Sequence, residues 1–161
     1  MELLKRTFGD AISLVRDTDS TGKTSTAYAQ RATLVFVDDS KLYITEHIRH
    51  GVITHYYYDW ISKDDKQVLA KFHCEPHQDE DYQTTTEPYH IHPPEYSKLT
   101  NQTRFANHSF TSLFAIVEGI FLFHIIPNKP HIRIQKGEGN PLFLLLIQTM
   151  AFKYCDVTCS A

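Results

Sequence analysis

The sequence predicts an α+β fold: an antiparallel β meander of about four to five strands, with an N-terminal helix and one or two C-terminal helices packed against it. Between Ala32 and His73, runs of alternating polar and apolar residues are separated by turn-forming residues, which is typical of consecutive strands. Before and after this segment, apolar residues recur at helical spacing. The chain has 161 residues, 42% hydrophobic and 22% charged, which suffices for one core and excludes a disordered chain.

The first predicted element is a short amphipathic helix at the N-terminus. Its apolar residues recur every three or four positions at Leu4, Phe8, Ala11 or Ile12, and Val15. The polar stretch 17–22 then ends the helix.

Strands are predicted next, bounded by turn-forming residues. They cover Thr33–Val37, Leu42–Arg49, Val52–Ile61, Val68–His73 and, after a long acidic loop, Tyr89–His92. The gap at His50-Gly51 predicts a two-residue hairpin loop. Such a loop fixes the pairing of its two strands, and we expect Glu46 opposite His55 and Ile48 opposite Ile53.

In the C-terminal part of the chain, the sequence pattern predicts two further helices and one strand. Ser109 can cap a helix that runs to Ile120. Beyond it, the pattern favours a strand over residues 131–135 and a buried helix over residues 142–154. We expect residues 1–125 to form the α+β domain and residues 126–161 to form a divergent extension packed on the same domain.

Charge and composition limit the partners. The 16 Lys and Arg residues against 19 Asp and Glu residues give a net charge of −3, so no global positive field attracts nucleic acid or an anionic membrane. The longest apolar run, 141–152, is shorter than the roughly 18 residues of a membrane-spanning helix. The three cysteines lack paired spacing and no secretory signal precedes them, which indicates a cytoplasmic protein with reduced thiols.

The chain is rich in histidine, with 10 residues, and several gather between residues 73 and 92. His90 and His92 are alternate residues on a predicted strand, so both imidazoles point to the same side, and His77 from the loop can join them. Three imidazoles suit a divalent metal such as zinc. In the alternative, Tyr89 and Ile91 form the core face and both histidines lie in solvent. The spacing alone leaves both interpretations open.

A second candidate for chemistry is the expected pair of Glu46 and His55. A carboxylate opposite an imidazole can hold one tautomer of the ring for general acid or base catalysis. Arg49 lies near this pair in sequence and can assist in binding a phosphate. An ordinary cross-strand polar pair, worth about 0.2 to 1 kcal/mol, is the alternative.

Four motifs occur in a fixed order along the chain. They are Ile44-Thr45-Glu46-His47-Ile48-Arg49, Tyr56-Tyr57-Tyr58-Asp59-Trp60, Phe72 to Pro76-His77, and Pro88-Tyr89-His90-Ile91-His92. Together they resemble the TumE family of small bacterial and archaeal proteins, regarded as toxin components of type II toxin–antitoxin modules. The resemblance covers roughly residues 30 to 122, including a helix after the histidine strand. It implies a compact α+β domain and, as the usual partner, a DNA-binding antitoxin encoded alongside.

The resemblance also implies which residues carry the family pattern. These are Glu46, Arg49, Tyr56, Tyr58, Trp60, Pro76, His77, Pro88, His90 and His92. The chain departs from the pattern where an Arg-aromatic-Asp-Asn run has become Lys71-Phe72-His73-Cys74, where a His-His doublet has become His77-Gln78, and in a longer acidic loop before Pro88.

These observations lead to two classes of function. In the first, the protein is a TumE-like toxin that acts on RNA in the manner of a ribonuclease. Its catalytic residues would be Glu46, His55, His77, His90 and His92, with Arg49, Tyr58 and Lys71 binding phosphate or substrate. In the second, it is a non-catalytic domain that binds a partner or a metal, or an inactive copy associated with a mobile element.

Overall fold

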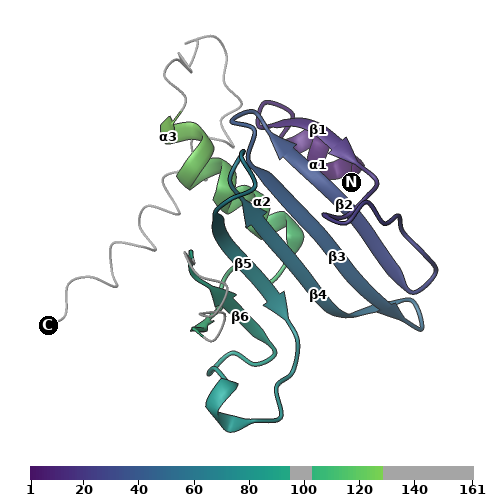
Figure 1. Ribbon diagram of the computed structural model, residues 1–161, viewed down its shortest axis with the longest axis vertical. Helices are drawn as coiled ribbons and strands as arrows, with labels where there is room; N and C mark the ends of the chain where they lie inside the picture. Colours follow the sequence, from purple (N-terminus) through teal and green to yellow (C-terminus); the bar gives the residue numbers. More distant parts are fainter. Residues whose placement is uncertain (95–102, 129–161) are drawn as a thin grey trace, which may run out of the picture. The chain divides into compact units, whose positions relative to one another are not determined.

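The structure, a computed structural model, describes residues 1–94 and 103–128. In this part of the chain, one antiparallel sheet contains seven strands in sequence order, each paired with the next (Figure 1). The strands are β1 (Ile12–Arg16), β2 (Ala29–Phe36), β3 (Lys41–Arg49), β4 (Val52–Ile61), β5 (Val68–Cys74), β6 (Tyr89–His92) and β7 (Phe105–Ala106). The predicted α+β meander is confirmed. The number of strands exceeds the prediction because β1 and β7 were not expected.

The N-terminal helix is shorter than predicted. Helix α1 spans Glu2–Thr7, and the residues expected to continue it form β1, which pairs with β2. Gly9 follows the helix, and glycine in a helix interior costs about 1 kcal/mol relative to alanine. The β-branched Ile12 and Val15 suit a strand better than a helix. Their helical spacing was therefore misleading, because edge pairing with β2 satisfies their backbone instead.

The hairpin between β3 and β4 has the predicted two-residue loop. His50 and Gly51 both adopt positive φ, 51° and 77°, as tight hairpin turns require, and glycine does so without steric cost. Beside the loop, Ile48 pairs with Ile53 as predicted.

A shift of register follows one residue later, between His47 and Ile48. Beyond this irregularity, Glu46 pairs with Tyr56 and His55 pairs with His47. The predicted pair of Glu46 and His55 is therefore wrong. Since neighbouring residues of a strand point to opposite faces, the shift places these two side chains on different sides of the sheet.

The C-terminal helix begins three residues later than expected. Helix α2 spans Leu113–Ile120, and its N-cap is Ser112, whose Oγ accepts a hydrogen bond from the backbone N–H of Ala115 at 3.2 Å. Ser109 is not the cap. The helix continues through a π-helical turn, η2 (Phe121–Ile125), into α3 (Ile126–Asn128).

Helices α1 and α2 lie on the same face of the sheet (Figure 1), which we call the helix face. Phe8, next to α1, packs against Phe114 of α2 with ring centroids 5.1 Å apart. The core between helices and sheet contains Leu34, Phe36, Leu42, Ile44, Tyr58, Phe72, Ile116, Val117 and Ile125. The alternate residues of β3, β4 and β5 point to the opposite side, the open face.

Between β5 and β6 runs the long acidic loop, which contains the short helix η1 (Glu80–Tyr82). No helix within residues 1–94 and 103–128 has the length and apolar character needed to cross a bilayer. The strand predicted over 131–135, the helix predicted over 142–154, and all but the first residues of the expected extension lie outside the described residues.

Candidate functional site

Polar residues of the sheet divide between its two faces. Glu46 lies on the helix face, 7% exposed, and its Oε1 accepts a hydrogen bond of 2.5 Å from the hydroxyl of Tyr58. The ring of Tyr58 stacks on that of Tyr56 with centroids 4.2 Å apart. Burial, followed by the contact with Glu46, raises the pKa of Tyr58 far above its ordinary value. This buried pair belongs to the core.

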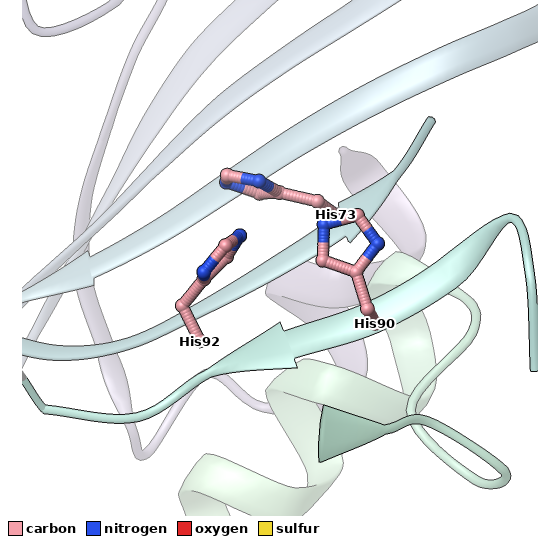
Figure 2. Close-up of side chains that lie close together, drawn as sticks. All are labelled: His73, His90 and His92. Atoms are coloured by element: carbon pink, nitrogen blue, oxygen red, sulfur yellow. The ribbon is translucent and has the colours of Figure 1, made fainter. Parts of the chain in front are cut away.

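Three histidines lie together on the open face. His73 of β5 pairs directly with His90 of β6, and His92 is two residues further along β6, so strand alternation puts all three on one side. Their ring centroids are 5.6 Å apart for His73 and His90, 4.8 Å for His73 and His92, and 5.0 Å for His90 and His92. Figure 2 shows the three rings gathered above the two strands. All three side chains are buried.

Hydrogen bonds hold two of these rings and leave the third without a partner. His73 Nε2 lies 3.0 Å from Asp59 Oδ1, and His92 Nδ1 lies 3.1 Å from the carbonyl oxygen of Thr103. Among the described residues, neither ring nitrogen of His90 has a hydrogen-bond partner, nor does Nδ1 of His73. Buried polar atoms usually have partners, so this cluster is unusual.

His77 lies beside this group, at the start of the acidic loop. Its Nδ1 is 3.3 Å from Glu87 Oε1, and its Nε2 is 3.4 Å from Glu75 Oε1. Glu87 also accepts the backbone N–H of His77 at 3.2 Å. The ring centroid of His77 is 4.9 Å from that of His90. Two carboxylates therefore fix the orientation of His77 next to the three histidines.

The electrostatics keep the deeper imidazoles uncharged. Burial lowers the pKa of His90 to about 4 and that of His92 to about 3, and the nearby charges of His73 and Arg104 act in the same direction. For Glu75, burial acts to raise the pKa, but the hydrogen bond from Tyr57 and the neighbouring imidazoles outweigh it and lower the pKa. The uncharged rings of His90 and His92 offer lone pairs, and the ionised Glu75 adds negative charge, so this group of residues suits a cation.

Two cationic side chains lie near the same face. Lys71 pairs with His92 across β5 and β6, so it shares the histidines' side of the sheet. The guanidinium of Arg104 lies 4.8 Å from the ring centroid of Tyr82. Both can attract an anionic group to the open face.

The structure brings together some of the residues that the sequence predicts as a site and separates others. His77, His90, His92 and Lys71 lie on or beside the open face. Glu46 and Tyr58 lie on the helix face, within the core. Arg49 ends β3 at the hairpin, opposite Val52, and His55 contacts Thr54 near the same end. The expected convergence of Glu46 with the histidines is not found.

Sequence reasoning missed several members of the site, among them His73 as a partner of His90, Asp59, Glu75 and Glu87. Their contacts depend on strand pairing or on the path of the acidic loop, and the sequence fixes neither. Asp59 and His73 are held together by the pairing of β4 with β5, in which Asp59 lies opposite Lys71 and Tyr57 lies opposite His73. Alternation within each strand shows which of its residues share a face. It does not show which residues of two strands meet, because that depends on the register.

Two overlapping groups can hold a metal ion among the described residues. One is His73, His90 and His92, and the other is Glu75, His77 and His90. Within each group, one ligand atom per residue lies within 4.8 Å of the others. The open face therefore offers both metal ligands and proton-transfer groups.

Comparison with known proteins identifies the family. A family model described as toxin TumE matches residues 4–121, which contain the last four residues of α1, all seven strands of the described sheet and α2. Comparisons with curated proteins and with solved structures find no match. Because the match spans well over half of the chain and includes both faces of the sheet, the protein belongs to the TumE family, whose members are toxins of toxin–antitoxin systems.

Proposed function

We propose that this toxin acts on RNA, with His77 on the open face as the proton-transfer group. The observation that carries the proposal is the position of His77 between two carboxylates, 3.4 Å from Glu75 and 3.3 Å from Glu87. Histidine exchanges protons readily near neutral pH, and flanking carboxylates stabilise the imidazolium that forms when it accepts one. Family membership adds the expectation of a toxic activity.

The chemistry of RNA cleavage fits this arrangement. His77 takes the proton from a ribose 2′-hydroxyl, whose oxygen then attacks the adjacent phosphorus. A 2′,3′-cyclic phosphate forms as the P–O5′ bond breaks, and the leaving 5′-oxygen takes a proton from water. Glu87 keeps the ring in place through its contacts with both the ring and the backbone of His77. A well-placed general base contributes about 10²- to 10⁴-fold in rate. His90 and His92 form the buried wall behind His77.

Substrate binding can use the cations of the same face. Lys71 and Arg104 supply positive charge for a phosphate, and the ring of Tyr82 beside Arg104 offers a surface on which a base can stack. The net charge of −3 means that this attraction is local rather than a property of the whole molecule. Arg49 lies at the hairpin end of the sheet, opposite Val52, and is not part of the proposed substrate-binding site.

The proposal extends to the partner and the compartment. We expect the partner to be a DNA-binding antitoxin encoded alongside, and the site of action to be the cytoplasm, where the RNA is. The acidic loop and the open face are where a neutralising partner would block His77.

Induced expression in bacteria tests the proposal. The unmodified chain is expected to arrest growth, and the purified protein to cleave RNA. His77→Ala should slow cleavage by about 10²- to 10⁴-fold and restore growth. His108→Ala, which changes an exposed histidine beyond β7, serves as the matched control and should remain toxic.

Two outcomes would overturn it. If all strains grow equally, the protein is a non-catalytic binding domain or an inactive copy. If His55→Ala restores growth while His77→Ala does not, proton transfer takes place near the β3–β4 hairpin instead of on the open face.

A further inference from the structure

We propose that His73, His90 and His92 form a binding site for one Zn²⁺ ion. The inference concerns a different group from the proton-transfer residue His77 and does not depend on action on RNA. It rests on the geometry of β5 and β6, which presents three buried imidazoles to one point on the open face (Figure 2).

The hydrogen bonds set the ring tautomers as a metal requires. His92 donates its Nδ1–H to the carbonyl oxygen of Thr103, so the lone pair is on Nε2. His73 donates its Nε2–H to Asp59, so the lone pair is on Nδ1, an atom without a hydrogen-bond partner among the described residues. Histidines that bind metals usually donate their other N–H to a carboxylate or a carbonyl in this way.

His90 supplies the third lone pair. Its side chain is 0% exposed, and neither ring nitrogen has a hydrogen-bond partner within the described part of the chain. Nε2 lies 4.0 Å from Glu75 Oε1, close enough for a small rotation to make that atom the donor to Glu75. Nδ1 then remains for the metal. An imidazole buried without partners costs stability, and a bound cation removes that cost.

The distances fit a tetrahedral ion. One ring nitrogen of each of the three histidines lies within 4.8 Å of the other two. Zn–N bonds of about 2.0 to 2.1 Å place tetrahedral ligands about 3.3 Å apart, so small side-chain rotations complete the site. Three protein ligands leave the fourth position for water or for an oxygen of Glu75.

The first test is the metal content of the purified full-length chain. After incubation with Zn²⁺ and removal of excess metal, elemental analysis is expected to give about one zinc per chain. Replacing zinc by Co²⁺ should produce the intense visible absorption of a tetrahedral site, and zinc should raise the melting temperature relative to a sample with chelator. A chain that retains no zinc and gains no thermal stability overturns the proposal.

Variants then distinguish this group from the overlapping one. His73→Gln and His92→Gln should each lose the bound zinc, whereas His77→Gln and the matched control His108→Gln should keep it. Asp59→Asn leaves all three ligands in place but removes the carboxylate that orients His73, and it should weaken zinc binding by about 10- to 100-fold.

If His77→Gln abolishes binding while His73→Gln does not, the ion belongs to Glu75, His77 and His90, and the proposal is wrong. Growth assays keep this outcome separate from the proposed function. A zinc-free protein that still arrests growth refutes the metal site alone, and a zinc-binding protein without toxicity refutes the action on RNA alone.

Discussion

Two tyrosine–glutamate hydrogen bonds, made by adjacent residues of β4, lie on opposite faces of the sheet. On the helix face, Tyr58 donates to Glu46 over 2.5 Å, and the two residues are 2% and 7% exposed. On the open face, Tyr57 donates to Glu75 over 2.6 Å, and the Glu75 side chain is 27% exposed. The same pair of residue types therefore occurs in a closed core and, on the open face, beside the buried histidine cluster.

The two faces differ in whether their buried polar atoms have hydrogen-bond partners. On the helix face, the hydroxyl of Tyr58 has its acceptor and the surrounding residues are apolar, as in an ordinary core. On the open face, Glu75 lies among histidines, and buried ring nitrogens lack partners. Unpartnered buried atoms lower stability, and proteins retain them where a ligand or a reaction uses them.

The largest expected effect is on the helix face. Tyr58→Phe removes the hydrogen-bond donor of a buried carboxyl group, and we expect the free energy of unfolding to fall by about 2 to 3 kcal/mol. Urea denaturation at neutral pH measures this change. Tyr57→Phe is the matched control on the open face, and it should cost about 1 kcal/mol or less, because Glu75 is accessible to water. Equal losses would remove the distinction between the faces.

A change of opposite sign is expected for His90→Leu. The substitution removes two buried ring nitrogens that have no hydrogen-bond partner and replaces the imidazole with an apolar side chain of similar volume. In metal-free buffer with chelator, we expect the variant to be more stable than the unmodified chain by about 1 kcal/mol. Thermal unfolding measures the difference. A loss of stability as large as that of Tyr58→Phe would show that His90 is an ordinary packing residue.

The smallest effect concerns the rim of the helix face, where Asp38 Oδ2 lies 2.8 Å from His124 Nε2 of η2. Burial acts to raise the pKa of Asp38, but hydrogen bonds from Ser40 and His124 outweigh it, and the pKa is lowered. This carboxylate therefore adds stability above its unfolded pKa of 3.8, and the contribution is lost as the pH falls through its lower folded value.

Asp38→Asn should accordingly reduce stability at neutral pH by less than about 1 kcal/mol, because the pair is partly exposed. The difference between the variant and the unmodified chain should shrink in strong acid. Denaturation midpoints measured from neutral to acidic pH give this curve. A difference that grows as the pH falls would have the wrong sign for this carboxylate.

Much of the sheet could be predicted from the sequence because its signals are local. The strands β2 to β6 follow from alternation between turn-forming residues, and the His50-Gly51 loop follows from the conformations that a tight hairpin requires. The two short edge strands were missed. Strand β1 has a pattern that also fits a helix, and β7 has only two residues, too few for any periodicity.

The part of the candidate site that could be predicted also rests on a local signal. His90 and His92 share a face because they are alternate residues of one strand, which the sequence states directly. The register that ignores the irregularity after His47 pairs Glu46 with His55, and the family resemblance groups Glu46 with the histidines of β6. The separation of Glu46 from the histidines follows from that single residue.

By itself, the sequence determined the antiparallel meander, most of its strands, the family resemblance, and the common orientation of His90 and His92. Only the tertiary structure decided that Glu46 belongs to the core, that His73 is opposite His90, and that Asp59 and Glu87 orient the imidazoles of the open face. The physical reason is that alternation is a property of one strand, whereas a site across several strands depends on register. A one-residue irregularity that leaves no local signal reverses which face each side chain occupies.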